Sequence, residues 1–200
     1  MSIYYKPLNL NMPILSDTAP LDILKTKYQT RLNDNLGVWF HPVLNYRNDN
    51  LGVWFHPTFL KFLESKHICL EFVETFYSKP DTVQTIHVDG TGGDFVKINY
   101  VIGGKDSVMN WYTVKSEISV ETTITEEKIK HLSFEKNQVE LIHSTITCPI
   151  SIVQVGIPHN VTNALEDRLC ISMVIAWQNG PENMITMAKA TEIFADYIVK

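Results

Sequence analysis

The sequence lacks the features that mark several large classes of protein. It has no continuous run of about 18 apolar residues, which a membrane-spanning helix needs. Its first segment, MSIYYKPLNLNMPIL, has neither the charged start nor the apolar stretch of a signal peptide. Basic residues do not predominate, since 17 Lys and Arg stand against 22 Asp and Glu. We therefore expect a cytoplasmic protein with no membrane and no nucleic-acid partner.

Cysteine is also scarce. Cys69, Cys148 and Cys170 are an odd number, show no CxxC spacing and lie in apolar, strand-like sequence. This pattern indicates small buried hydrophobic side chains rather than a disulfide framework or a zinc site.

The overall amino-acid composition is that of a globular protein. Its 200 residues are 44% hydrophobic and 20% charged, which suits one well-buried core, so we expect one domain over 1–200. Asp17 and Pro20, followed by LDILKTKYQTRL, predict an amphipathic helix at the end of an N-terminal segment that extends to residue 57. A second, short helix is predicted over 58–67.

The N-terminal segment contains an internal duplication. NDNLGVWFHP occupies residues 33–42 and, unchanged, residues 48–57, but no third copy follows, and a solenoid needs at least about three. We interpret this as one local copying event. We expect the second copy to keep its place in the core and the first to be extruded as a longer loop. His41 and His56, being duplicated, indicate turn and packing material rather than ligands.

Beyond residue 67 the hydrophobic pattern changes to a period of two. Short segments rich in β-branched and aromatic residues alternate with Gly, Pro, Asp and Asn, which predicts the strands of a sandwich or small barrel. The predicted strands are 68–77, 83–88, 94–102, 107–114, 138–146, 150–157 and 168–177. We expect a helical turn at 124–132 and a closing helix over 181–199, which begins at Pro181. The predicted fold is mainly β, with helices packed on an antiparallel sandwich.

One strand end carries a candidate site. In IHVDG, residues 86–90, His87 and Asp89 are two positions apart, so on an extended chain they share one face and Val88 points away. A His-x-Asp pair alone is weak support for a metal site, because so short a pattern arises often by accident. A third ligand has to come from elsewhere in the chain.

The segment 156–172, GIPHNVTNALEDRLCIS, offers that ligand. His159 follows a proline near a strand, and Arg168 begins the next strand. Two His and one carboxylate on one triangular face leave three positions open, as in non-haem Fe(II) oxygenases. A buried Arg168 without an acidic neighbour on its own strand face needs an anion, and its planar fork fits a carboxylate.

With His87-x-Asp89, then His159, then Arg168, the sequence resembles the Fe(II)/2-oxoglutarate-dependent oxygenases of the prolyl-hydroxylase type. The surrounding segments 97–112 and 158–172 also look like the strands around that family's pocket, and the resemblance covers about residues 58–177.

The resemblance implies a double-stranded β-helix, or jelly roll, as the β core over 58–177. It implies that His87, Asp89 and His159 bind Fe(II) as the catalytic centre, and that Arg168 pairs with the distal carboxylate of the cosubstrate 2-oxoglutarate, with ascorbate as an accessory reductant. The activity implied is hydroxylation of a small molecule or a protein side chain, with 2-oxoglutarate converted to succinate. Asp89 favours hydroxylation over halogenation, because halogenating members lack that carboxylate.

Some positions depart from the family pattern or leave choices open. One branch of the family places Ser two residues after the Arg, where this chain has Cys170, and Ser172 lies further on. Asn99 is a candidate for holding the cosubstrate, but which face of its strand points inward is open. Trp111 and Tyr112 are pocket-wall candidates, although core packing is the more common role of strand aromatics.

Two other functions stay open. The chain could be a jelly-roll binding or structural protein without turnover, or a cupin-like metalloenzyme that uses no cosubstrate. Arg168 could instead pair with Glu166 or Asp167.

Overall fold

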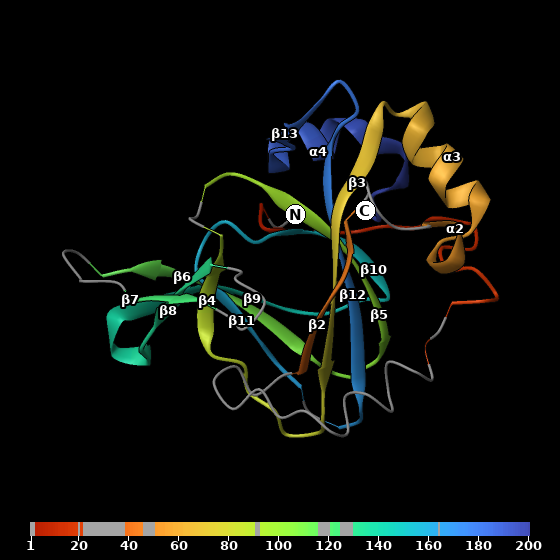
Figure 1. The fold of residues 1–200 in the computed structure, drawn as a ribbon. Helices are drawn as coiled ribbons and strands as arrows, with labels where there is room; N and C mark the ends of the chain where they lie inside the picture. The colour runs from red at the N-terminus through yellow and green to blue at the C-terminus, as the bar shows by residue number, and fades with distance from the viewer. Residues whose placement is uncertain are drawn as a thin grey trace.

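Two antiparallel β-sheets make up most of the fold (Figure 1). The computed structural model describes residues 3–19, 21, 39–45, 51–90, 93–115, 121–124, 130–163 and 165–200. The larger sheet contains β1 (Tyr5–Pro7), β2 (Trp39–Asn45), β3 (Ile68–Ser78), β5 (Val96–Gly103), β10 (Ile150–Gln154), β12 (Arg168–Trp177) and β13 (Gly180–Met184). The smaller contains β4 (Ile86–Asp89), β6 (Val108–Val114), β7 (Glu121–Ile124), β8 (Lys130–Phe134), β9 (Val139–Ile146) and β11 (His159–Thr162).

The strand order defines the topology as a jelly roll. The larger sheet runs β1-β10-β5-β12-β3-β2, with β13 beside β12, and the smaller runs β7-β8-β4-β11-β6-β9. From β3 to β12 the chain changes sheet at each step, apart from the β6 to β9 segment, where it stays in the smaller sheet. This winding gives four jelly-roll strands per sheet, in the orders β10-β5-β12-β3 and β4-β11-β6-β9. That is the double-stranded β-helix, so the predicted fold class is confirmed.

Helices cover the outer face of the larger sheet. The described helices are α2 (Leu51–Trp54), α3 (Pro57–Ser65) and α4 (Met187–Ile193), with 3-10 turns η1 (Lys136–Gln138) and η2 (Ala195–Tyr197). Figure 1 shows α3 and α4 together at one end, away from the β7–β8 hairpin. Fully buried Phe59 and Leu63 of α3 pack in one cluster with Ile98, Ile152 and Met173 of the sheet. Each such side chain contributes about 1.5–3 kcal/mol by leaving water.

Because helices pack on the outer face, the opposite face of the larger sheet is turned toward the smaller sheet. Alternation along β5 places Val96 and Ile98 in the helix-covered core and Lys97 and Asn99 on the inner face. None of the helices in the described part of the chain is long and apolar enough to cross a membrane.

Most of the predicted elements are confirmed. Each of the seven segments with period-two alternation contains a strand: β3, β4, β5, β6, β9, β10 and β12. The short helix predicted over 58–67 is α3, which begins at Pro57 after an N-cap, His56. The helix expected after Asp17 falls almost wholly on residues outside the described ranges.

Two predictions about helices are wrong. The helical turn expected at 124–132 is replaced, in its described residues, by the end of β7 and the start of β8, which pair as a hairpin. The closing helix expected over 181–199 is shortened to α4 and η2, because Gly180–Met184 forms β13 against β12. In both places pairing with a neighbouring strand satisfies the backbone groups that a helix would satisfy locally.

The duplicated segment adopts two different structures. In the second copy, Leu51–Trp54 form α2, Phe55 is fully buried in the core, and the His56 Nδ1 caps α3 by accepting a hydrogen bond from the Thr58 amide at 3.2 Å. Of its described residues, Phe55 therefore has the predicted place in the core, whereas Val53 is exposed. In the first copy, 39–42 belong to β2 and pair with β3, so the expectation of an extruded loop is wrong there. Strand pairing overrides the local preference that the two copies share.

Candidate metal centre

The fold brings together three side chains that lie far apart in the sequence. His87 and Asp89 lie on β4, and His159 begins the neighbouring strand β11 directly opposite His87. Directly opposed residues share a sheet face, and the two imidazole centroids are 4.5 Å apart. Asp89 follows on the same face, with its Oδ1 3.5 Å from His87 Nε2. The sequence predicted that His87 and Asp89, two positions apart, share one face of a strand, and the structure has them on one face.

The donor atoms of this cluster fit a divalent metal. One ligand atom from each of His87, Asp89 and His159 lies within 4.8 Å of the other two. The His87 Nδ1 is 2.8 Å from the Thr85 carbonyl oxygen, and the His159 Nδ1 is 2.9 Å from that of Ile157. A carbonyl only accepts, so each Nδ1 carries the proton and each Nε2 is the nitrogen that could bind a metal. Two imidazoles and one carboxylate suit Fe(II).

The three side chains line one pocket with Arg168. Arg168 enters this pocket from β12 of the larger sheet. Its polar lining also includes Gln84, Asn99 and Ser172, and its other walls are Phe76, Met109, Val155, Val161 and Cys170. The two sheets therefore contribute opposite sides of the pocket: the smaller sheet contributes the cluster of two histidines and a carboxylate, and the larger sheet contributes a cation.

Arg168 is buried, and no acidic residue among those that the structure describes forms an ion pair with it. It is 2% exposed, and its Nε has no hydrogen-bond partner among the described residues. No ion pair joins it to Glu166, Asp167 or another acid within the described ranges. Its stem lies against Gly104 (φ +67°), where an added Cβ would be 2.6 Å from the Arg168 Cγ. The absence of a side chain at Gly104 thus leaves room for the Arg168 stem. A buried cation with no acidic partner among the described residues indicates an anionic ligand.

Asn99 lies on the inner face, which answers the question left open by the sequence. Its side chain lines the pocket, whereas Ile98 is fully buried under the helices. The Ser172 hydroxyl donates to the Asn99 Oδ1 at 2.8 Å. Ser172 therefore lines the pocket although it lies two residues beyond the position where one branch of the resembled family has its Ser. Cys170, which occupies that position here, also lines the pocket.

Trp111 is a core residue. It is fully buried, and its Nε1 donates to the Gln154 carbonyl oxygen at 2.8 Å. Tyr112 is half-buried, and its hydroxyl donates to the Asn160 Oδ1 at 3.1 Å. Neither residue lines the pocket described above, so packing is the role that the structure gives them.

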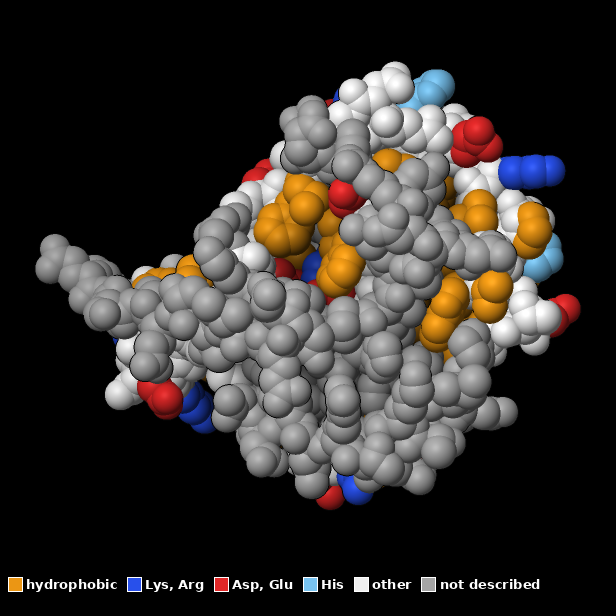
Figure 2. Space-filling view, viewed as in Figure 1, with side chains coloured by type: hydrophobic (Ala, Val, Ile, Leu, Met, Phe, Trp, Pro, Cys, Tyr) orange, Lys and Arg blue, Asp and Glu red, His pale blue; other side chains and the backbone are white. Residues whose placement is uncertain are grey.

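Two charged residues beside the site were missed by sequence reasoning. Lys97 on β5 is 3% exposed, and its Nζ lies 2.7 Å from Asp89 Oδ2 and also forms an ion pair with Glu74 of β3. The sequence carried a signal for them: Glu74 and Lys97 are charged residues inside predicted strands, and such charges are rarely buried unless paired. On the face seen in Figure 2, a few acidic and basic side chains lie recessed among hydrophobic ones.

The charges of the cluster are set by burial and by Lys97. Burial alone would raise the pKa of the Asp89 carboxyl, but the Lys97 ammonium, His159 and His87 together outweigh burial and hold that pKa below its usual range. Burial lowers the pKa of His159 to about 4, and the adjacent His87 adds to the effect. At neutral pH the centre therefore offers a carboxylate and a neutral His159, the forms that bind metals.

The low pKa of His159 predicts that the metal-free protein loses stability in acid. The unfolded chain takes up this proton below about pH 6.5, but the folded chain does so only near pH 4. The free energy of unfolding should thus fall by about 3 kcal/mol between pH 7 and pH 4 and be unaffected by His159 above that range. Urea unfolding of chelator-treated protein measures this. His159→Gln should flatten the dependence and His143→Gln should not; an equal slope in wild type and His159→Gln would contradict the assignment.

Fold and cluster together define the class: a jelly-roll protein with a candidate metal centre between its sheets. No family model and no curated protein match the chain. Similar solved structures include a viral collagen prolyl hydroxylase from Paramecium bursaria Chlorella virus-1, with 12% identity, a TM-score of 0.40, and coverage of 86% of this chain and 95% of that one.

Two further solved structures are also similar to this chain. HygX from Streptomyces hygroscopicus, with nickel, 2-oxoglutarate and hygromycin B bound, has 9% identity and a TM-score of 0.36, over 81% and 80% of the two chains. Pumpkin seed globulin has 11% identity and a TM-score of 0.31, over 63% of this chain and only 28% of the globulin. At these values the assignment of the fold rests on strand order, not on the likenesses.

Proposed function

We propose that the protein is a non-haem iron, 2-oxoglutarate-dependent dioxygenase that hydroxylates a small molecule or a protein side chain. The observation that carries the proposal is the buried, unpaired Arg168 Nε in the pocket that also contains His87, Asp89 and His159. A metal site alone would suit many jelly-roll proteins. A metal site facing a buried guanidinium suits a ligand that is a metal chelator at one end and an anion at the other, as a 2-oxo dicarboxylic acid is.

Each part of the pocket has a role in this proposal. His87, Asp89 and His159 would hold Fe(II), which when bound would activate dioxygen, while 2-oxoglutarate would supply two electrons as it is decarboxylated to succinate. Arg168 would orient the cosubstrate by binding its distal carboxylate with two N–H groups. Asn99 and Ser172, already hydrogen bonded to each other, add polar contacts beside it.

The apolar walls would protect the reaction from water. Phe76, Met109, Val155 and Val161 surround the polar groups. An apolar lining excludes solvent, which strengthens the Arg168–carboxylate pair and limits side reactions. These walls also suit the methylene groups between the two carboxylates of 2-oxoglutarate.

Succinate release tests the proposal without knowledge of the hydroxylated substrate. Purified protein supplied with Fe(II), ascorbate and 2-oxoglutarate should release succinate slowly, and N-oxalylglycine should suppress the release. The melting temperature should rise with Mn(II) and further with 2-oxoglutarate, because both bind the folded state. No succinate together with no thermal shift would overturn the proposal in favour of a binding or structural jelly roll.

A further inference from the structure

Asp89 is held by a chain of buried charges on the side away from the pocket. Its Oδ2 accepts from the Lys97 ammonium at 2.7 Å, and the same ammonium pairs with Glu74. Glu74 and Lys97 are 5% and 3% exposed, and neither is part of the pocket lining given above. The three residues come from β3, β5 and β4, so the chain joins the larger sheet to the strand end that carries the cluster.

This contact makes the two oxygens of Asp89 unequal. Oδ2 is engaged by Lys97, whereas Oδ1 is turned to His87 Nε2, 3.5 Å away. The two imidazoles are fixed in a comparable way, each by a backbone carbonyl at its Nδ1. Each of the three side chains therefore has one polar atom in contact with an outer partner, Lys97 or a backbone carbonyl. Its other polar atom is directed toward the other two members of the cluster. Outer partners of this kind orient ligands and contribute about 10–100-fold to metal affinity.

We propose that Glu74 and Lys97 are positioning residues for a metal centre, and that Asp89 offers Oδ1 alone to a divalent cation. Glu74 acts on Lys97: it provides a second acceptor, so the ammonium stays where it can donate to Oδ2. Lys97 then prevents the carboxylate from turning to bind the ion through both oxygens. This inference rests on the metal centre of the proposed function and adds residues that the cluster itself does not include.

Two substitutions at Glu74 separate positioning from charge. Glu74→Gln removes the negative charge but keeps an oxygen that accepts from Lys97, and should bind Mn(II) within a few-fold of the wild type. Glu74→Met removes the acceptor, so Lys97 is released, and should weaken Mn(II) binding by about 10–100-fold. Calorimetric titration with Mn(II) measures both, and circular dichroism checks that each variant folds.

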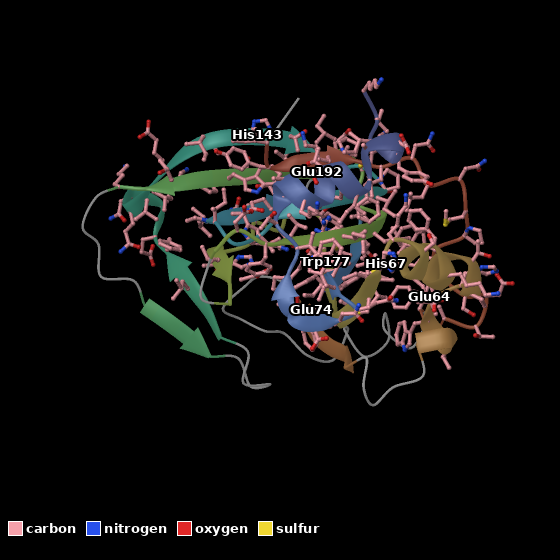
Figure 3. All side chains as sticks on the ribbon, turned by 90° about the horizontal axis from the view of Figure 1, so that it is seen from above. Glu64, His67, Glu74, His143, Trp177 and Glu192 are labelled. Atoms are coloured by element: carbon pink, nitrogen blue, oxygen red, sulfur yellow. The ribbon has the colours of Figure 1, made fainter. Side chains whose placement is uncertain are left out.

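A surface ion pair provides the matched control. Glu192 pairs with Lys189 at 2.7 Å on α4, both side chains being well exposed, and Figure 3 shows it apart from Glu74. Glu192→Gln and Glu192→Met should therefore leave Mn(II) binding unchanged. Equal loss in both Glu74 variants would show that charge and not positioning matters, and no loss in Glu74→Met would also overturn the inference.

A Mn(II)-soaked crystal of the wild-type protein tests the same point without any variant. The expected result is one Asp89 oxygen on the ion and the other within hydrogen-bond distance of Lys97 Nζ. Two Asp89 oxygens on the ion would overturn the positioning role while leaving the metal centre intact. Absence of Mn(II) binding by the wild type would overturn the metal centre itself, so the two failures can be told apart.

Discussion

Asp89→Asn should weaken Fe(II) or Mn(II) binding by about 100-fold or more and abolish succinate release. The loss of an outer partner of a ligand already costs about 10–100-fold, and this change removes a ligand itself. The Lys97 ammonium makes the effect specific, because it donates to one end of the side chain at 2.7 Å. An asparagine would keep its oxygen on Lys97 and direct its NH2 group to the histidines, and an amide NH2 does not bind a metal.

We expect this substitution to leave the shape of the site unchanged, so a loss of metal binding would report the loss of the ligand itself. Asparagine is nearly isosteric with aspartate and keeps an acceptor for Lys97, so thermal unfolding of the metal-free variant should stay cooperative. Asp196→Asn, at an exposed position in η2, is the matched control and should bind metal as the wild type does. Unchanged metal affinity in Asp89→Asn, measured by calorimetry, would remove Asp89 from the ligand set.

Arg168→Met should separate cosubstrate binding from metal binding. Truncating one partner of a buried charge pair costs about 2–5 kcal/mol, which corresponds to about a 30- to 4,000-fold loss of 2-oxoglutarate affinity. Mn(II) binding should be retained, because Arg168 lies across the pocket on the larger sheet. Methionine keeps the unbranched stem that packs on Gly104 and removes only the guanidinium.

The stability of the ligand-free variant gives a second, opposite readout. An unsatisfied buried polar group costs about 1–3 kcal/mol, and the Arg168 Nε is such a group. Arg168→Met should therefore raise the free energy of unfolding by about that amount and abolish the thermal shift caused by 2-oxoglutarate. Arg168→Lys, which keeps a charge but not the planar fork, should recover part of the affinity. Activity that is unchanged in Arg168→Met would favour a cupin-like enzyme without a cosubstrate.

The strand predictions succeeded where the pattern was local and strong. Segments such as 68–77 and 168–177 alternate β-branched and aromatic residues between turn residues, and both are central strands of the larger sheet. The predictions failed where pairing decided the outcome. Residues 130–132 and Gly180–Met184 form strands because β7 and β12 lie beside them, and the local sequence did not show those neighbours.

The sequence by itself determined which residues can share a face, because side-chain alternation along an extended chain depends only on backbone dihedral angles. That is how His87 and Asp89 were grouped. Only the tertiary structure decided that β11 sets His159 opposite His87, that Glu74 and Lys97 reach Asp89, and that two identical segments fold differently. These outcomes depend on pairing between distant strands, whose free energy comes from contacts that no short window of sequence contains.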